Sequence, residues 1–273
     1  MKLEEYLAVA VRGARLGAEI LKTNFGKIRM QQAQSKGIND YVSRVDRESE
    51  EALRQFLTKS LPEAAFLGEE QGQQGKASKY RWIVDPLDGT TNYLQGFPVF
   101  GVSIALEKVV SGQNWGEIIV GVVVHPITGE IWSAVRGKGA QKDGHPIRIG
   151  KKKELSRALL ATGFPFRAKD RLDDYLKTFR ELFLRSIGIR RAGAASLDLC
   201  WTAEGIFDAF WEHALSPWDI AAGALIVEEA GGKITGFEGK DDYLQSGDVV
   251  AANSSLHSQM LEVIRANFSA ITQ

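Results

Sequence analysis

The sequence has few of the residues and segments that would place it in several common classes of protein. It holds one cysteine, Cys200, so neither an intrachain disulfide nor a cysteine metal cluster is possible within it. Basic and acidic residues number 34 each, which argues against a general affinity for nucleic acid or an anionic membrane. No apolar run approaches the length of about 18 residues that spans a bilayer, and the N-terminus does not read as a secretory signal. We therefore expect a cytoplasmic protein with neither nucleic acid nor membrane as a partner.

Several familiar catalytic motifs are also missing. The chain contains no GxxxxGK[ST] phosphate-binding loop, no HExxH pair among its 4 histidines, and no serine in a GxSxG turn. These absences argue against P-loop, zinc-peptidase and α/β-hydrolase chemistry. The remaining candidates for chemistry are carboxylates, which bind metal ions through oxygen.

The hydrophobic pattern in the first half predicts two helices followed by strands. Apolar residues recur at helical spacing over residues 3–25 and again from about Asp46 to just before Pro62. The polar stretch between these helices predicts a mobile loop or a loose hairpin. Residues 100–135 have the β-branched, alternating texture of consecutive strands.

The second half has a different order. Beyond about residue 155, strands and helices alternate up to a final helix that begins near Ser254, and residues 239–247 read as a loop. Helices that alternate with strands beside a long antiparallel region predict a layered α/β protein whose sheets are covered by helices. We expect one domain over residues 1–273, built from two tightly packed lobes that meet near residue 150.

Residues 82–92, WIVDPLDGTTN, bring two carboxylates to the end of a buried strand. Asp85 directly follows three apolar residues, and an unpaired carboxylate at that depth would be costly to desolvate. A divalent cation shared with Asp88 would remove the cost, and oxygen ligands without histidine or thiolate favour Mg²⁺ over zinc. Gly89 and Thr90 begin a helix, where free N–H groups suit a phosphate. The segment predicts two-metal phosphoryl chemistry, with ions about 3.5–4 Å apart.

Each acidic candidate outside Asp85 also has an ordinary structural explanation. Helix capping, a favourable position on a helix dipole, or simple solvent exposure would account for Asp46, Glu69, Glu70, Asp88, Glu212 and Asp219. The residue pattern alone leaves these alternatives open.

Two segments resemble the signatures of the inositol monophosphatase family. WIVDPLDGTTNY is similar to the first signature and PWDIAAGALIVEEAGG to the second, while FLGEE and RRAGAASLDLC match in order and spacing. The resemblance covers essentially the whole chain. It implies an αβαβα sandwich of the inositol monophosphatase and fructose-1,6-bisphosphatase type, usually a homodimer and sensitive to lithium. Gly236 departs from the pattern, since many relatives carry aspartate there, but it lies outside the metal set.

The resemblance also implies a metal-ligand set. Glu69, Asp85 and the backbone carbonyl of Leu87 would hold the first Mg²⁺. Asp85, Asp88 and Asp219 would hold the second, and Glu69 would contribute to a weaker third ion.

The same resemblance implies which residues serve the water and the substrate. Glu70 and Thr90 would orient the attacking water, with Asp46 hydrogen-bonded to Thr90. Phosphate would bind the N–H groups of Gly89 and Thr90. The ring hydroxyls of the alcohol would meet Asp88, Glu212 and the backbone of Gly193, Ala194 and Ala195. Lys36 matches a lysine near the metal site.

The implied reaction is hydrolysis of a phosphate monoester by metal-activated water, without a phosphoenzyme. We favour myo-inositol 1-phosphate as substrate, because Glu212 can accept two hydrogen bonds from vicinal hydroxyls and Thr91-Asn92 resembles the monophosphatase version of the motif. A broader sugar-phosphate phosphatase is the alternative, acting on fructose 1,6-bisphosphate, 3′-phosphoadenosine 5′-phosphate or histidinol phosphate. An alternative of another class is a phospholigand sensor that keeps the fold without turnover.

Overall fold

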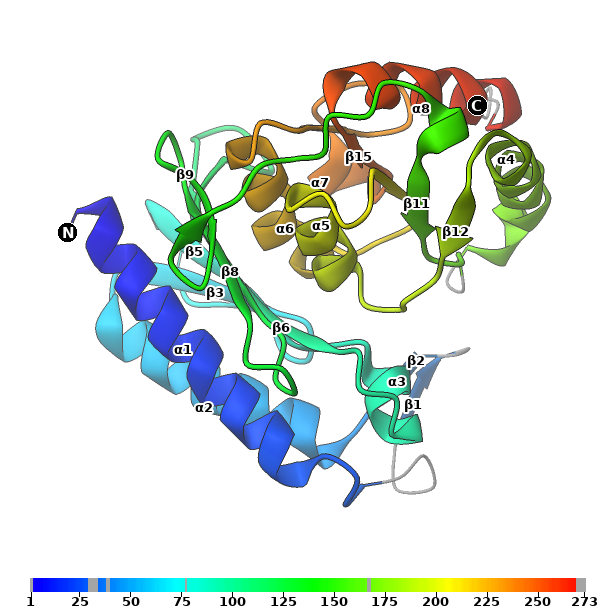
Figure 1. Ribbon diagram of the computed structural model, residues 1–273. Coiled ribbons are helices and arrows are strands. Elements are labelled where there is room, and N and C mark those ends of the chain that lie inside the picture. Colours follow the sequence, from blue (N-terminus) through cyan, green and yellow to red (C-terminus); the bar gives the residue numbers. More distant parts are fainter. Residues whose placement is uncertain (1, 29–33, 38–39, 77, 166–167, 269–273) are drawn as a thin grey trace.

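Five layers of alternating helices and sheets make up the chain (Figure 1). The computed structural model describes residues 2–28, 34–37, 40–76, 78–165 and 168–268, except for the side chains of residues 34–37 and 40–42. The layers are, in order, α1 with α2, an eight-stranded sheet, α5 with α6, a five-stranded sheet, and α4 with α8. This order confirms the predicted αβαβα sandwich.

The first sheet is built from the first half of the chain. Helices α1 (Leu3–Asn24) and α2 (Arg44–Ser60) cover one of its faces. From edge to edge its strands are β10 (His145–Pro146), β9 (Gly139–Lys142), β8 (Ile131–Val135), β7 (Glu117–Val124), β6 (Gly101–Lys108), β5 (Tyr80–Asp88), β3 (Ala64–Gly68) and β4 (Gly72–Gln74). Only β3 and β5 run parallel. Beyond α1, the short strands β1 (Gln34–Gly37) and β2 (Asp40–Val42) pair in antiparallel fashion, which agrees with the hairpin, one of the two predicted forms.

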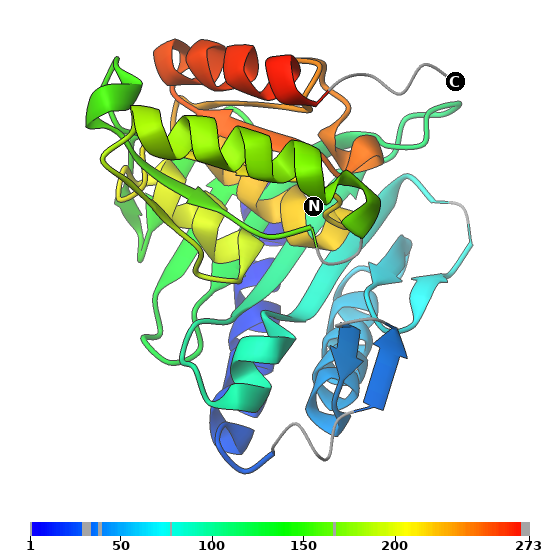
Figure 2. The same ribbon diagram turned by 90° about the vertical axis from the view of Figure 1, so that its right-hand side faces the viewer.

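The second sheet is built from the second half. Its strands, in order, are β12 (Gly188–Arg190), β11 (Leu159–Thr162), β13 (Ala209–Glu212), β15 (Val249–Ala252) and β14 (Lys233–Thr235). Helices α4 (Leu172–Arg185) and α8 (Ser254–Asn267) lie side by side over its outer face (Figure 2). The short elements are α3 (Thr90–Gln95), α7 (Tyr243–Ser246) and the 3₁₀ turns η2 (Leu155–Arg157) and η3 (Lys169–Arg171).

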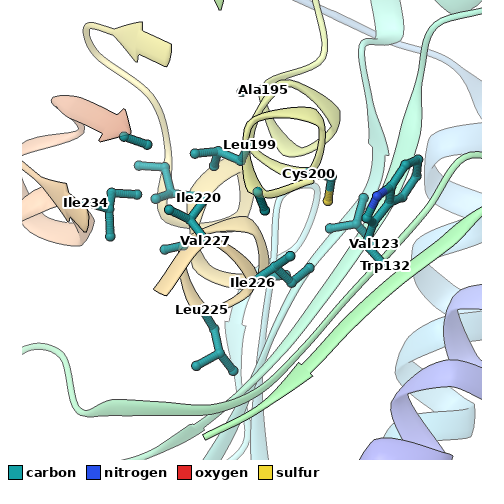
Figure 3. Close-up of a cluster of buried hydrophobic side chains, with 14 of the residues drawn as sticks. Val123, Trp132, Ala195, Leu199, Cys200, Ile220, Leu225, Ile226, Val227 and Ile234 are labelled. Atoms are coloured by element: carbon teal, nitrogen blue, oxygen red, sulfur yellow. The ribbon is translucent and has the colours of Figure 1, made fainter. Parts of the chain in front are cut away.

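Helices α5 (Ala195–Ala203) and α6 (Pro217–Glu229) fill the space between the two sheets (Figure 3). The sequence of α6 is apolar on every side from Ile220 to Val227, and all of these residues are buried. A helix that is hydrophobic all round is stable only in such a central position. The first turn of α6 precedes this buried stretch, and there Pro217 and Trp218 are partly exposed while Asp219 is buried.

Two local expectations are corrected by the structure. Helix α2 begins at Arg44 with Ser43 as its N-cap, so Asp46 is the third residue of a Ser-x-x-Asp capping box and not the cap itself. The predicted loop over residues 239–247 contains the single turn α7, which is too short to leave a periodic signal. In the described part of the chain, no helix combines the length and apolarity needed to cross a bilayer.

Candidate active site

The end of β5 contains an irregularity in its pairing with β6, which turns the side chains of Asp85 and Asp88 toward the same side. Asp85 pairs with Ser103 of β6 and Asp88 pairs with Gly101, so the register shifts between the two aspartates. In a regular strand, residues three apart point to opposite faces of the sheet. A bulge changes that alternation, and here Asp85 and Asp88 both line one pocket. The Leu87 N–H donates to Asp85 Oδ1 at 2.9 Å and stabilises the bulge.

Gly89 turns the chain from β5 into α3. Its φ of +89° lies in the left-handed region, which favours glycine. A Cβ at this position would lie 3.1 Å from the Val99 carbonyl oxygen and 3.2 Å from that of Gly193, so a larger residue would be strained and crowded. Gly89, rather than Asp88, is the N-cap of α3. The carboxylate of Asp88 is therefore available to the pocket.

Thr90 connects the turn to helix α2. Its Oγ1 lies 3.1 Å from the Leu87 carbonyl oxygen and 3.1 Å from Asp46 Oδ1. Asp46 is fully buried, and its other oxygen accepts the Ser43 N–H at 2.9 Å. Burial raises the pKa of Asp46, while hydrogen bonds from Ser43 and Thr90 oppose that rise. The arrangement fixes the Thr90 hydroxyl against a carboxylate behind the pocket.

The third carboxylate comes from the other half of the molecule. Asp219 lies in the first turn of α6, where its Oδ2 accepts the N–H of the N-cap Ser216 at 2.8 Å. Asp219 does lie in the first turn, where an acid complements the helix dipole, and the structure adds a capping-box contact, yet the same side chain also faces the pocket. One oxygen each from Asp85, Asp88 and Asp219 lie within 4.8 Å of one another.

Burial and the proximity of the three carboxylates raise the pKa values of Asp85 and Asp88. Burial, and then the charges of Glu69, Asp88 and Asp219, raise the pKa of Asp85 well above its usual value. Burial and the Asp219 charge raise the pKa of Asp88 to about 7, although hydrogen bonds from Ser196 pull it down. The three acids repel one another unless protons or cations are present.

The pocket around this cluster contains most of the predicted site residues. Those that line it are Glu69, Asp85, Leu87, Asp88, Gly89, Thr90, Gly193, Ala195, Glu212 and Asp219. Three predicted residues that the structure describes do not line the pocket themselves. Glu70 and Ala194 are sequence neighbours of lining residues, and Asp46 is hydrogen-bonded to the lining residue Thr90. The side chain of Lys36 lies outside the described residues.

Two residues to which the sequence analysis assigned no contact, Ser196 and Asn92, support the site. Ser196 donates its backbone N–H to Asp88 Oδ2 at 2.8 Å, across 108 residues of sequence. Asn92 Nδ2 lies 2.8 Å from the Val99 carbonyl oxygen and 2.9 Å from that of Ala192. The Ser196–Asp88 and Asn92–Ala192 contacts join the end of β5 and helix α3 to the segment that leads into α5. Their side chains are small and polar, and only the family motif would have drawn attention to them.

Glu212 faces the pocket from the end of β13. Position 163 must be glycine for this to happen, because a Cβ there would lie 1.8 Å from Glu212 Oε1. The pocket wall also includes Arg191, whose guanidinium carbon lies 5.7 Å from the centre of the Phe164 ring. The wall therefore combines an anion, a cation and an aromatic side chain beside the acid cluster.

The residues of the pocket fit a divalent cation. Asp85, Asp88 and Asp219 are exposed by only 1%, 8% and 9%, and like charges buried this closely require a counter-charge. All three offer carboxylate oxygens, which are the ligands of hard cations such as Mg²⁺. The cluster can thus bind metal, and its chemistry favours oxygen-seeking ions over zinc or copper.

The chain belongs to the inositol monophosphatase family, whose sequence profile matches residues 2–272. The family is one of metal-dependent phosphatases, and this membership supports a phosphatase that acts on a small phosphorylated substrate.

Known relatives match over nearly their whole length. The Nus factor SuhB of Pseudomonas aeruginosa is 42% identical over 268 residues, covering 96% of this chain and 97% of the relative. A fructose-1,6-bisphosphatase/inositol-1-monophosphatase of Aquifex aeolicus is 41% identical over 263 residues, covering 96% of each chain. Among solved structures, the extragenic suppressor protein suhB of Bartonella henselae superposes with a TM-score of 0.90 at 38% identity, over 96% of this chain and 99% of the other.

Proposed function

We propose that this chain is a Mg²⁺-dependent phosphate monoester hydrolase whose substrate is myo-inositol 1-phosphate. The observation that carries the proposal is the cluster of Asp85, Asp88 and Asp219 oxygens within 4.8 Å. The cluster lies in one pocket with Glu69 and with Glu212, a carboxylate suited to vicinal hydroxyls. Because the pocket draws residues from both halves, we propose that residues 1–273 act as one catalytic unit.

The metal ligands follow from the donors in the pocket and from the family pattern. Glu69, Asp85 and the Leu87 carbonyl would hold one Mg²⁺, Asp85, Asp88 and Asp219 a second, and Glu69 would contribute to a third. When bound, the ions supply charge neutralisation at the phosphate and an acidified water as nucleophile.

The chain's own residues bind and orient the reactants. The Thr90 hydroxyl donates a hydrogen bond to Asp46, so the Thr90 oxygen can in turn accept a hydrogen bond from water, and Glu70 would help to orient that water. The N–H groups of Gly89 and Thr90 would hold the phosphate in line with it. The acids that could attack phosphorus are used as metal ligands, so we propose direct attack by water without a phosphoenzyme.

Recognition of the alcohol part of the substrate would use the pocket wall that contains Glu212 and Arg191. Asp88, Glu212 and the backbone of Gly193, Ala194 and Ala195 would bind the ring hydroxyls. Arg191, a cation in the same wall, suits a second phosphate and keeps bisphosphate substrates as the alternative within this function. A relative with a double name for fructose-1,6-bisphosphatase and inositol-1-monophosphatase activity supports keeping that alternative.

The first test of the function is phosphate release with and without Mg²⁺. The panel contains myo-inositol 1-phosphate, fructose 1,6-bisphosphate, 3′-phosphoadenosine 5′-phosphate and histidinol phosphate. We expect Mg²⁺-dependent release that is fastest with the inositol ester. Fastest release from another ester would keep the mechanism and change the substrate, whereas no release from any of them would reject the function.

A Glu212→Gln variant tests the role of Glu212. We expect kcat/KM for myo-inositol 1-phosphate to fall about tenfold, because a charged acceptor of hydroxyl hydrogen bonds is replaced by a neutral one. The value for p-nitrophenyl phosphate, which has no ring hydroxyls, should change less than about twofold.

Two further variants complete that experiment. Gly163→Ala should give the same selective loss, because its Cβ would displace the Glu212 carboxylate. Glu181→Gln, on the surface of α4 where it pairs with Arg185, is the matched control and should leave both substrates unaffected. A Glu212→Gln protein with unchanged preference between the two substrates would remove Glu212 from recognition.

A partner-binding role without turnover is a second candidate function. The specific observation in its favour is that a relative 42% identical to this chain is named a Nus factor. The substrate panel separates the two functions, because a folded protein that binds Mg²⁺ and releases no phosphate would favour the second.

We also propose a homodimer, as the family resemblance implies. Exposed apolar side chains on α4 and the turn after it offer a candidate surface, namely Leu172, Leu176, Phe183, Leu184 and Ile187. Light scattering after size exclusion measures the mass directly, and a mass of one chain would reject the dimer. Cytoplasmic location and lithium sensitivity remain predictions.

A further inference from the structure

Helix α2 presents a buried polar stripe toward the candidate site. The stripe consists of Asp46, Ser49 and Glu50, which share one helix face and are each 0% exposed. Asp46 contacts Thr90, and Ser49 Oγ donates to the Pro86 carbonyl oxygen at 3.3 Å. Glu50 extends the stripe in another direction, because its Oε2 accepts the Glu70 N–H at 2.8 Å. One helix face therefore contacts both acid-bearing segments of the pocket.

The contact between Glu50 and the turn that joins β3 to β4 is close and specific. Gly68 ends β3, Glu69 and Glu70 follow in the turn, and the chain returns as β4, with Gly72 opposite Gly68. A Cβ at position 68 would lie 2.3 Å from Glu50 Oε2 and 2.6 Å from Glu50 Cδ. The carboxylate thus occupies the space that any side chain at position 68 would need. Glu50 and Gly68 are a matched pair at the base of the turn.

A carboxylate in this position requires an explanation. Burial of an ionised group is costly unless hydrogen bonds compensate it, and an apolar side chain would fill the space at a lower cost. A hydrogen bond from a backbone N–H to a carboxylate is stronger than a neutral one, so it holds the turn in a defined position. The residue before the held N–H is Glu69, which lines the pocket beside Asp85.

We propose that Glu50 is a positioning residue, which sets the place of the Glu69 carboxylate beside Asp85 by holding the N–H of Glu70. The inference rests on the proposed Mg²⁺-dependent function, and it adds a residue that contacts neither metal nor substrate. It assigns helix α2 the role of fixing the distance between two ligand-bearing segments, one after β3 and one after β5.

The experiment compares three variants on α2. Glu50→Met keeps the volume but removes the acceptor, Glu50→Gln keeps an acceptor oxygen, and Glu48→Gln changes an exposed glutamate that pairs with Arg44. Two quantities are measured: the Kd for Mg²⁺ by calorimetry, and the exchange rate of the Glu70 amide hydrogen in metal-free protein. We expect Glu50→Met to raise the Kd about tenfold and to speed the exchange about tenfold, since the donor loses its partner. For Glu50→Gln, both the Kd and the exchange rate should stay within about threefold of the wild-type values. For Glu48→Gln, both should equal the wild-type values.

The outcomes separate this inference from the proposed function. Absence of Mg²⁺ binding by the wild-type protein would reject the function, while the amide exchange would still test the contact. Normal Mg²⁺ affinity and normal protection of the Glu70 amide in a folded Glu50→Met protein would overturn the inference. If Glu50→Met does not fold, Gly68→Ala takes its place, because its Cβ displaces the carboxylate. An unchanged Mg²⁺ affinity in Gly68→Ala would equally overturn it.

Discussion

An Asp88→Asn protein is expected to lose at least about a thousandfold in phosphate release while it remains folded. Electrostatic stabilisation by a bound metal contributes several kcal/mol to a phosphoryl transition state, and each 1.4 kcal/mol corresponds to about tenfold in rate. Asparagine keeps an oxygen that can accept the Ser196 N–H, which Asp88 accepts at 2.8 Å. The contact between the two halves should therefore survive.

The same substitution should raise the stability of the metal-free protein at neutral pH. It removes one of the mutually repelling charges that perturb Asp85 and Asp88. We expect a higher Tm than that of the wild type in EDTA, and a smaller increase in Tm when Mg²⁺ is added. Loss of activity together with a gain in stability is typical of a site whose charges serve function.

Asp208 provides the matched control. It is also buried, and its Oδ2 accepts the Leu159 N–H at 2.7 Å and lies 2.8 Å from Lys152 Nζ, away from the pocket. Asp208→Asn should lower the Tm by several degrees and leave kcat unchanged. If the Asp88→Asn protein retains a tenth or more of the wild-type rate of phosphate release, the assignment of Asp88 as a metal ligand is wrong.

The metal-free wild-type protein is expected to lose stability as the pH rises through neutrality, and Mg²⁺ should restore it. The folded pKa of Asp88 is raised from 3.8 to about 7, so the folded state binds a proton that the unfolded state has already released. A raised pKa contributes stability that is fully present below the unfolded value and is lost as the pH rises through the folded value. Between about pH 6.5 and about pH 8.5, this single group should cost about 1 kcal/mol, so we expect the Tm in EDTA to fall by about 2 °C.

This pH window is chosen to avoid opposing titrations. Burial lowers the pKa of His257 to about 4 and also lowers that of His125, so these groups reduce stability on the acid side, below about pH 6.5. Thermal melts in EDTA across the window, repeated with excess Mg²⁺ and with Asp88→Asn, measure the effect. The slope should flatten in both cases. A slope of equal size in Asp88→Asn would assign the pH dependence to other groups.

The general architecture was predictable because its signals are local. The apolar stripe over residues 3–25, the alternating segments near residues 100–135 and the apolar sequence of α6 each specify an element without reference to the rest of the chain. Asp85 could also be identified from its local sequence, because a carboxylate directly after the apolar residues WIV needs a hydrogen-bond partner or a counter-charge. The grouping of that residue with Asp219 was expected only from the family resemblance, because no local rule connects β5 with α6.

The residues that were missed act through long-range packing. Glu50 lies in the segment RESEEALRQ among other acids and reads as a surface residue. The face defined by Leu53 and Leu57 extends back by three and four residues to Glu50 and Asp46, so helical periodicity could have identified both as buried. Gly163 and Gly68 carry no such signal. Their importance comes from carboxylates that approach them from distant parts of the chain.

The central position of α6 has a consequence for assembly of the molecule. During synthesis, Asp85 and Asp88 are made long before Asp219, and most of the inner face of the first sheet is covered by α6, with a smaller part covered by α5. Docking of that helix completes the apolar interior and, in the same step, brings the third charge to the other two. A cation that binds the finished cluster therefore stabilises the association of the two halves, by thermodynamic linkage. Loosening the packing of α6 between the sheets should weaken metal binding even when every ligand is intact.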